Sequence, residues 1–475
     1  MYDQFWSFIT DIRRMLAISA YVSLAILVAV YVLIIQRRRF GNIPIWTSMT
    51  IGALLMVLLQ VITVESAFAA INLDIILFLF GMFSIVSALE KSGVLGLIAI
   101  KMVSRTKDNP SYLLLVFIVG LGILSAFLVN DTIAILGVPL AIYVMRSIKP
   151  IPIVLLIGLA FGITIGSVMT PIGNPQNLLI AIQGGIQLPF ITFLTILAIP
   201  TIINLLLTYF ILKLYFRKEL LQLRYNLMMM NLRWQIKKRS DDDNTDSQIV
   251  KNNNMSTAII NPTLAKISVI VLLAVISGFI IVEALRFLGI IIADRGFSIS
   301  VITITGATIL YTISKERTEL IKSIDYSVLI FFAAMFVFTA GLWTSGLISE
   351  ILSYFPSPVP SGSIASNNAI IAFISVSFSQ LLGNVPFVAL YNLVMIDNGF
   401  AGDDDVYEWM MLAAASTIAG NLTILGAASN IIIIGATESR GFKSFGYIEF
   451  LKIGSIVTLV NVVIYYLFIL LISYI

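Results

Sequence analysis

Two short polar stretches interrupt the long apolar runs of this sequence, and they match each other. The first is Gly166–Asn177 (GSVMTPIGNPQN) and the second is Asn421–Asn430 (NLTILGAASN). In lipid, backbone that leaves the helix must find partners in protein or water, so such breaks are costly unless they line a site. The two stretches therefore predict an internal repeat with a broken helix at the middle of the membrane in each copy. Identical residues lie 253 positions apart in the two: Thr170 and Thr423, Gly173 and Gly426, Asn177 and Asn430.

The composition is that of a membrane protein. The chain has 475 residues, of which 59% are hydrophobic and 11% charged, and its mean hydropathy is +1.01. Soluble domains carry about 25% charged residues. The sequence therefore predicts a multi-pass protein of the cell membrane with the lipid bilayer as its partner, and the first apolar run is expected to stay as an anchor.

Two residue types do not occur in this sequence, and their absence excludes several kinds of catalytic and metal site. The chain has no cysteine and no histidine, which excludes disulfides, thiolate or imidazole metal sites and Ser-His-Asp or Cys-His catalysis. Few carboxylates are expected at membrane depth. We therefore expect no enzyme, no cofactor and no bound metal other than a coupling ion. The net charge of +4 gives no indication of nucleic-acid binding, because basic residues of membrane proteins mostly mark cytoplasmic loops.

The first half contains one apolar segment too long for a simple loop and flanked by like charges. A span needs about 20 apolar residues, and 16–36, 44–64 and 71–90 qualify before the long region 111–213. Basic clusters flank 111–147 on both sides, and one complete crossing would place one of them outside. The segment is therefore predicted to be a re-entrant hairpin that turns near Asn130–Thr132, followed by a broken helix at about 151–187.

The second half mirrors this plan. Its spans are predicted at 266–285, 297–314, 326–346 and 450–474. The loop 350–366 has no Lys or Arg, and the loop after 397 is acidic, so both are predicted to be external. A second hairpin at about 367–396, with Asn384 near its middle, and a broken helix at about 407–437 lie between these spans.

Taken together, the segments predict an all-α integral membrane fold built from an inverted repeat. The first transmembrane repeat is 1–213, the cytoplasmic linker is 214–265 and the second repeat is 266–475. Each repeat has five spans and one re-entrant hairpin. An odd number of spans per repeat gives the two halves opposite orientation, as in many secondary transporters.

The hairpin tips and broken helices are the predicted cargo site. Helices that stop at mid-membrane expose backbone N–H or C=O groups and half of a helix dipole. Small hydrogen-bonding side chains there suit an oxyanion, a neutral acid or a partly dehydrated sodium ion; the alternative role for any single one is helix capping or interhelical hydrogen bonding. The candidate residues are Asn130, Asp131, Thr132, Thr170, Gly173, Asn174, Asn177, Asn384, Thr423, Gly426, Ser429 and Asn430.

Asp131 is the one carboxylate predicted near mid-membrane, and intramembrane acids are candidates for proton or cation binding. No Lys or Arg falls in the inner part of any predicted span. An ionised Asp131 about 5 Å from an anion would cost ~3 kcal/mol at an effective dielectric near 20. Either Asp131 is protonated or paired with a cation, or the cargo is neutral, and coupling to H⁺ or Na⁺ is expected. Sodium would lie near Asn130, Asp131, Thr170, Asn384 and Thr423.

These residues resemble the ion-transporter superfamily, which includes arsenite permeases, citrate and dicarboxylate–sodium symporters and a group of sodium/proton antiporters. The stretch Thr170–Asn177 (TPIGNPQN) is similar to its first broken helix, and Leu77–Gly93 is similar to the span before its first hairpin. The resemblance implies elevator-type alternating access and homodimers. The dicarboxylate branch typically has Ser-Asn-Thr at both tips. Here the first tip reads Asn-Asp-Thr and the second Gly-Asn-Val, and the first is more similar to the arsenite-permease branch.

The sequence therefore predicts a secondary active transporter of a small inorganic or organic anion or its neutral oxyacid, of the arsenite or antimonite type, coupled to H⁺ or Na⁺. If the transporter is of the arsenite type, a soluble ATPase is a candidate partner. The alternatives are a sodium-coupled citrate or dicarboxylate symporter and a Na⁺/H⁺ antiporter. A channel, which saturation of flux would distinguish, and a membrane enzyme rank lower.

Overall fold

The computed structural model describes residues 2–36, 43–104, 109–145, 153–225, 260–290, 299–324 and 326–474. Within these ranges the regular structure is helical and contains no strand, so the all-α prediction is confirmed. Seven of the described helices are long and apolar enough to cross a membrane, and an eighth candidate is the segment Asn384–Asn421, which bends by 113°. The predicted linker 214–265 lies outside the described residues at 226–259.

The helices of the first half are α1 (Tyr2–Ile35), α2 (Ile45–Leu58), α3 (Val64–Ala70), α4 (Leu73–Ser92), α5 (Val94–Ser104), α6 (Pro110–Leu115), the π-helix η1 (Val116–Gly120), α7 (Leu121–Leu128), α8 (Asn130–Met145), α9 (Ile153–Gly166), η2 (Ser167–Met169), α10 (Pro175–Gln183) and α11 (Pro189–Tyr215). Those of the second half are α13 (Pro262–Phe287), α14 (Ile299–Ile313), α15 (Arg317–Lys322), α16 (Tyr326–Thr344), α17 (Leu347–Leu352), α18 (Ile364–Leu382), α19 (Asn384–Asp397), η4 (Gly402–Asp405), α20 (Val406–Ile418), η5 (Ala419–Asn421), η6 (Ile424–Gly426), α21 (Ala428–Glu438) and α22 (Tyr447–Ser473).

The chain turns in the same way at the two predicted hairpin tips. In the first half α7 ends at Leu128, Val129 has φ 61° and ψ 127°, and α8 begins at Asn130. In the second half Gly383 separates α18 from α19 with φ 78° and ψ 155°. One residue of positive φ therefore ends each incoming helix and leaves an asparagine as the first residue of the outgoing one.

The two broken helices also share one backbone course. In each, a helix (α9 or α20) gives way to a 3₁₀ turn, and an extended residue follows. That residue is Thr170 (φ −139°, ψ 156°) in the first half and Thr423 (φ −130°, ψ 159°) in the second. The outgoing arms, α10 and α21, then begin behind the extended residues Asn174 and Ala427, which are also 253 positions apart.

The halves interlock through exchanged partners. The 253-residue offset makes α14 the counterpart of α2, and α16 the counterpart of α4. In the fold each helix packs on the counterpart of the other: α4 packs on α14, and α2 packs on α16. Likewise α8 packs on α21, and α10 packs on α19. Thr208 of α11 and Asn461 of α22, which are themselves 253 positions apart, are hydrogen-bonded at 3.5 Å. A residue that touches its own counterpart lies close to the axis that relates the two copies.

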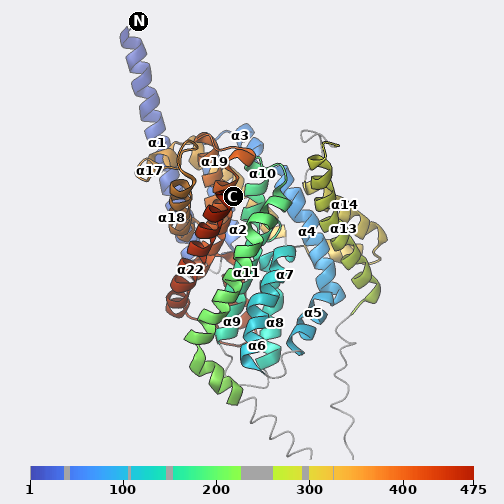
Figure 1. The fold of residues 1–475 in the computed structure, drawn as a ribbon. Helices are drawn as coiled ribbons and strands as arrows, with labels where there is room; N and C mark the ends of the chain where they lie inside the picture. The colour runs from blue at the N-terminus through green and yellow to red at the C-terminus, as the bar shows by residue number, and fades with distance from the viewer. Residues whose placement is uncertain are drawn as a thin grey trace, which may run out of the picture.

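The corresponding helices α5 and α17 lie towards opposite ends of the molecule. The 253-residue offset pairs α5 with α17, and Figure 1 shows α5 in the lower part of the helix bundle and α17 in its upper part. The direction of each half relative to a bilayer, and thus the inversion, stays a prediction.

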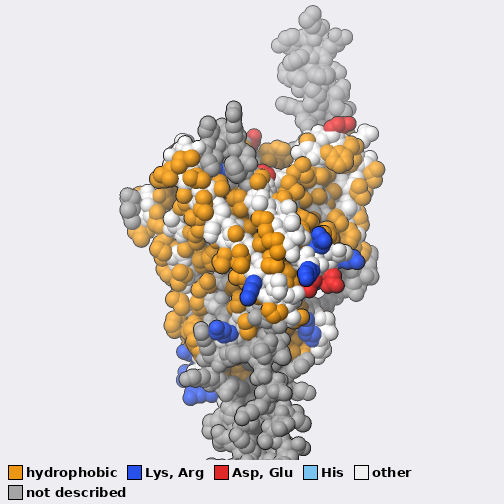
Figure 2. Space-filling view, turned by 90° about the vertical axis from the view of Figure 1, so that its right-hand side faces the viewer, with side chains coloured by type: hydrophobic (Ala, Val, Ile, Leu, Met, Phe, Trp, Pro, Cys, Tyr) orange, Lys and Arg blue, Asp and Glu red, His pale blue; other side chains and the backbone are white. Residues whose placement is uncertain are grey.

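The outer surface suits a lipid environment. Hydrophobic side chains cover much of the coloured face in Figure 2, and most Lys and Arg lie in its middle and lower parts. Large apolar residues stand outward on several spans, including Phe210, which is 58% exposed, and Leu459, which is 67% exposed. Polar residues such as Asn177 and Asn430 are instead fully buried.

Candidate substrate and ion site

The first broken helix is held together by two asparagines. Asn174 caps α10, because its Oδ1 accepts the backbone N–H of Asn177 at 2.8 Å. The Nδ2 of Asn177 donates to the carbonyls of Ser167 (3.1 Å), Val168 (3.3 Å) and Thr170 (3.1 Å). Carbonyls released by the end of α9 therefore find a donor inside the protein, which is what a break in a membrane helix requires.

The second broken helix repeats this arrangement. The Nδ2 of Asn430 donates to the carbonyls of Gly420 (2.8 Å) and Thr423 (3.4 Å), which are the counterparts of Ser167 and Thr170. The repeated sequence motif thus encodes a repeated hydrogen-bond pattern.

The motif glycines are needed for close packing of the turns. A Cβ on Gly173 would lie 2.2 Å from the carbonyl oxygen of Ser167, and one on Gly426 would lie 3.0 Å from that of Ala419. The N–H of Gly173 donates to Thr170 at 3.3 Å, and that of Gly426 donates to Thr423 at 3.1 Å.

The two motif threonines are tied to the hairpins. The hydroxyl of Thr170 donates to the carbonyl of Ala126 in α7. The hydroxyl of Thr423 donates to Oε1 of Gln380 in α18 at 2.8 Å. Each broken helix is therefore fastened to the incoming hairpin arm of its own half.

The hairpin tips reach the broken helices. The N–H of Asn130 donates to the carbonyl of Gly173 at 2.9 Å, and Asn384 Nδ2 lies 3.5 Å from the carbonyl of Thr417 in α20. Asp131 and Thr132 follow in the first turn of α8, the former partly buried and the latter buried. Because α8 packs on α21, this helix lies where the two halves meet.

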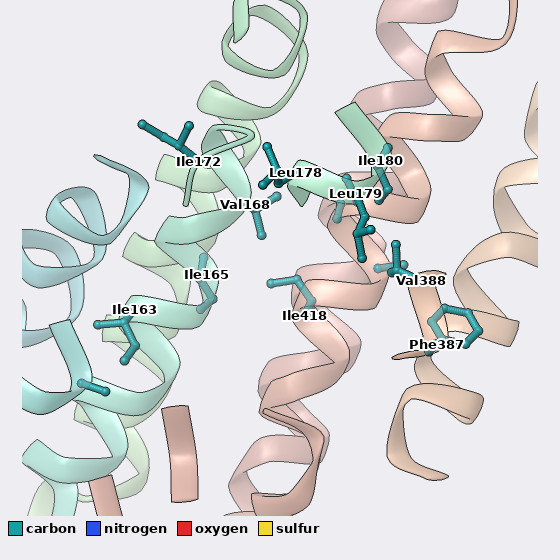
Figure 3. Packing of buried hydrophobic residues seen from close by; sticks show 14 of the residues in the cluster. Ile163, Ile165, Val168, Ile172, Leu178, Leu179, Ile180, Phe387, Val388 and Ile418 are labelled. Carbon is teal, nitrogen blue, oxygen red and sulfur yellow. The ribbon is translucent and has the colours of Figure 1, made fainter. Parts of the chain in front are cut away.

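Thr417 joins the halves directly. Its hydroxyl accepts Nδ2 of Asn174 and Nε2 of Gln176, both at 3.3 Å, and donates to Oδ1 of Asn177 at 3.2 Å. A hydroxyl has one donor and two acceptor positions, so all three are used. Figure 3 shows the apolar packing beside this junction, with Ile418 of α20 between Ile165 of α9 and Val388 of α19.

Several buried polar atoms near the junction have no hydrogen-bond partner within the described residues. Buried polar groups are normally hydrogen-bonded, so each exception asks for an explanation such as a ligand. These atoms are Asn130 Oδ1, Asn384 Oδ1, Asn421 Oδ1 and Nδ2, Ser429 Oγ and Asn430 Oδ1.

Charge is scarce around this region. Among the residues whose side chains are described, no Lys or Arg is buried, and the buried carboxylates are Glu283 and Glu408. Both lie near helix ends: Glu283 accepts the N–H groups of Phe190 (2.7 Å) and Ile191 (2.8 Å) at the start of α11. The site is thus built mainly from neutral amides, hydroxyls and backbone groups.

The structure brings the predicted residues of tips and breaks into one region, whereas ligand binding by them stays a prediction. Sequence reasoning missed Thr417, Gln176, Gln380 and Asn421. A signal existed for Thr417, because Thr164 lies 253 positions before it. Gln176 and Asn421 lie within the quoted stretches but have no identical counterpart, and Gln380 is placed by the tertiary fold alone.

Residues 31–403, most of the chain, match the model of the family described as citrate transporter, CitMHS. The chain belongs to this family. An uncharacterized transporter of Mycobacterium tuberculosis is 25% identical over 451 residues, covering 93% of this chain and 96% of the relative. A putative transporter, arsB, of Dictyostelium discoideum is 25% identical over 485 residues, covering 86% of this chain and 84% of the relative. The silicon efflux transporter LSI3 of Oryza sativa subsp. japonica is 26% identical over 417 residues, covering 81% of this chain and 83% of the relative.

These matches confirm the superfamily that the sequence resembled. With its apolar helices, this member of the citrate transporter family is a multi-pass membrane protein and a secondary transporter of the CitMHS and arsB type. The family and the names of the relatives point to transport rather than catalysis.

Proposed function

We propose that this transporter moves a small inorganic oxyacid of the arsenite or antimonite type, largely in its neutral form, coupled to H⁺ or Na⁺. The observation that carries the proposal is the set of amide oxygens on Asn130, Asn384 and Asn430 that have no hydrogen-bond partner in the described part of the chain. Amide oxygens accept hydrogen bonds or coordinate cations. They favour a solute rich in O–H groups, or a cation, over a bare anion.

The scarcity of buried positive charge supports the same proposal. A dicarboxylate or citrate normally meets charged or bidentate donors, and no Lys or Arg is buried among the side chains described. Two relatives bear names that concern oxyacid-forming elements, the putative transporter arsB and the silicon efflux transporter LSI3.

Sodium-coupled transport of citrate is the second candidate. The family description, citrate transporter, favours it. In that case co-bound sodium ions and helix dipoles would have to neutralise the substrate, because the described residues of the site include no basic side chain.

The test is transport by purified protein reconstituted in liposomes, with arsenite, antimonite, citrate and succinate offered under an imposed pH gradient or Na⁺ gradient. We expect saturable arsenite flux that follows one of the gradients. The double variant Asp131→Asn with Asn384→Ala should lower it at least about tenfold, equivalent to ~1.4 kcal/mol. Normal flux in a double variant that retains a cooperative melting transition would contradict the proposal, and flux of citrate alone with Na⁺ would favour the second candidate.

A further inference from the structure

Each broken helix, together with the hairpin tip of its own half, forms one half-site of the candidate site. The two half-sites have the same backbone course, but different hydrogen bonds complete them. In the first, the hydroxyl of Thr417 donates to Asn177 Oδ1 at 3.2 Å and accepts Gln176 Nε2 at 3.3 Å. The corresponding hydroxyl for the second half-site would be that of Thr164. It donates instead to the carbonyl of Ala160 in its own helix at 2.9 Å.

The corresponding polar atoms of the second half-site consequently have no hydrogen-bond partner within the described residues. Asn430 corresponds to Asn177, and its Oδ1 has no partner within the described residues; Ser429 corresponds to Gln176, and its Oγ has none either. Both residues are fully buried. The orientation of the Asn430 amide is fixed, because its Nδ2 donates to two carbonyls, which can only accept.

Asn384 adds a third open oxygen at the same place. A Cβ built on Gly420 would lie 2.9 Å from Asn384 Nδ2, and the carbonyl of Gly420 accepts Asn430 Nδ2. The side chains of Asn384 and Asn430 therefore both lie beside Gly420. Asn384 Oδ1 also has no partner among the described residues.

We propose that the transporter's ligand is held by the second half-site, defined as Asn384, Ser429 and Asn430. In the first half-site Thr417 satisfies Asn177 and Gln176 from within the protein, which leaves Asn130 Oδ1 as the amide oxygen there without a partner among the described residues. The ligand provides the hydrogen-bond donor or positive charge that the hydroxyl of Thr164 does not provide, because that hydroxyl donates within its own helix. It is therefore a species that neutral oxygens can hold, either a dehydrated monovalent cation or the O–H groups of a neutral oxyacid. This division of roles rests on the proposed transport function, and the symmetric sequence motif does not reveal it.

The test is ligand-dependent thermal unfolding of the purified full-length protein. Sodium chloride is titrated against choline chloride at constant ionic strength, and arsenous acid is titrated separately, because ligand binding raises the melting temperature by mass action. We expect Ser429→Ala to raise the half-saturating concentration of the stabilising ligand about three- to tenfold, as loss of one hydrogen bond or ligand contact would. Its ligand-free melting temperature should stay near the wild-type value, because no protein partner is lost.

Thr417→Val and Thr164→Val are the matched controls. Thr417→Val should lower the ligand-free melting temperature, Thr417→Ser should restore it, and its effect on the half-saturating concentration should be smaller than that of Ser429→Ala. Thr164→Val should leave the half-saturating concentration unchanged. The ligand whose affinity falls in Ser429→Ala identifies the occupant as Na⁺ or oxyacid.

Two results overturn the proposal in distinguishable ways. Stabilisation of the wild type that is unaffected by Ser429→Ala but weakened by Thr417→Val would assign the ligand to the first half-site and leave the transport function standing. Absence of stabilisation by both ligands in the wild type would contradict the division of roles and the proposed substrate class together.

Discussion

At the scale of single residues, the two hairpin tips share a backbone conformation of positive φ but place different residues in it. Val129 and Gly383 both have positive φ, at 61° and 78°. Such backbone is strained for a β-branched residue and unstrained for glycine. Val129 is buried, with 2% exposure, so its packing offsets part of the strain, and the glycine supplies the freedom that the second tip needs.

Replacement of Gly383 by alanine is predicted to destabilise the protein by about 1–2 kcal/mol, because the backbone at φ 78° and ψ 155° suits glycine alone. Steric overlap would not contribute, since the nearest atom to an added Cβ is Pro386 Cδ at 3.9 Å. Thermal unfolding of the purified Gly383→Ala variant measures the effect.

The control is Gly435→Ala in the interior of α21, where an added Cβ meets nothing within 4 Å. Because alanine is the better helix former, this variant should be stabilised by up to about 1 kcal/mol. Equal effects of the two substitutions would refute the backbone explanation for Gly383.

At the scale of elements, α11 begins without a cap of its own. Leu188 precedes it and makes no side-chain capping bond, and Pro189 fills the first position. Glu283 of α13 accepts the next two N–H groups instead. A carboxylate at a helix N-terminus satisfies unpaired donors and complements the helix dipole, so this contact joins α13 of the second half to α11 of the first.

Glu283→Gln is predicted to lower stability by about 1–2 kcal/mol, since one of the two accepting oxygens becomes a donor and the charge is lost. The loss should appear as a lower melting temperature of the purified protein. The exposed Glu350 provides the control, and Glu350→Gln should change stability by no more than about 0.5 kcal/mol. An unchanged melting temperature in Glu283→Gln would show that the contact contributes nothing to stability.

At the scale of the whole molecule, the 253-residue repeat governs the packing. The exchanged pairs α2–α16 and α4–α14 bury each half against the other. The contact between the counterparts Thr208 and Asn461 marks where the relating axis runs. Such interlocking leaves neither half with a complete surface of its own, so the two halves are expected to fold as one unit.

The inversion of the repeat predicts that Lys101 and its counterpart Tyr354 face opposite sides of the membrane. Both side chains are exposed, and the chain contains no cysteine, so Lys101→Cys and Tyr354→Cys each introduce a unique thiol. A membrane-impermeant maleimide added to intact cells should label the Tyr354 variant, and the Lys101 variant only after permeabilisation. Labelling of both from the same side would refute the inverted arrangement.

Much of this architecture follows from local sequence. Long apolar runs must become helices in lipid because the backbone has no other partner there. A polar, glycine-containing interruption must then be a break, which is why Gly166–Asn177 and Asn421–Asn430 could be located from the sequence. The role of Asn177 and Asn430 as donors to released carbonyls follows the same logic, since it depends on residues within ten positions.

The sequence by itself thus determined the membrane class, the helical fold, the family and the positions of the breaks and tips, because these depend on hydropathy, backbone needs and a repeat that can be read along the chain. The tertiary structure alone decided which hydroxyl completes which half-site. Thr417 and Thr164 are identical residues at equivalent positions, yet the first reaches across to Asn177 and the second bonds to its own helix. The physical reason is that a hydroxyl donates one proton. Helix α20 packs on α10 and α9 packs on α21, so the local geometry of each contact in the folded protein selects where that proton goes.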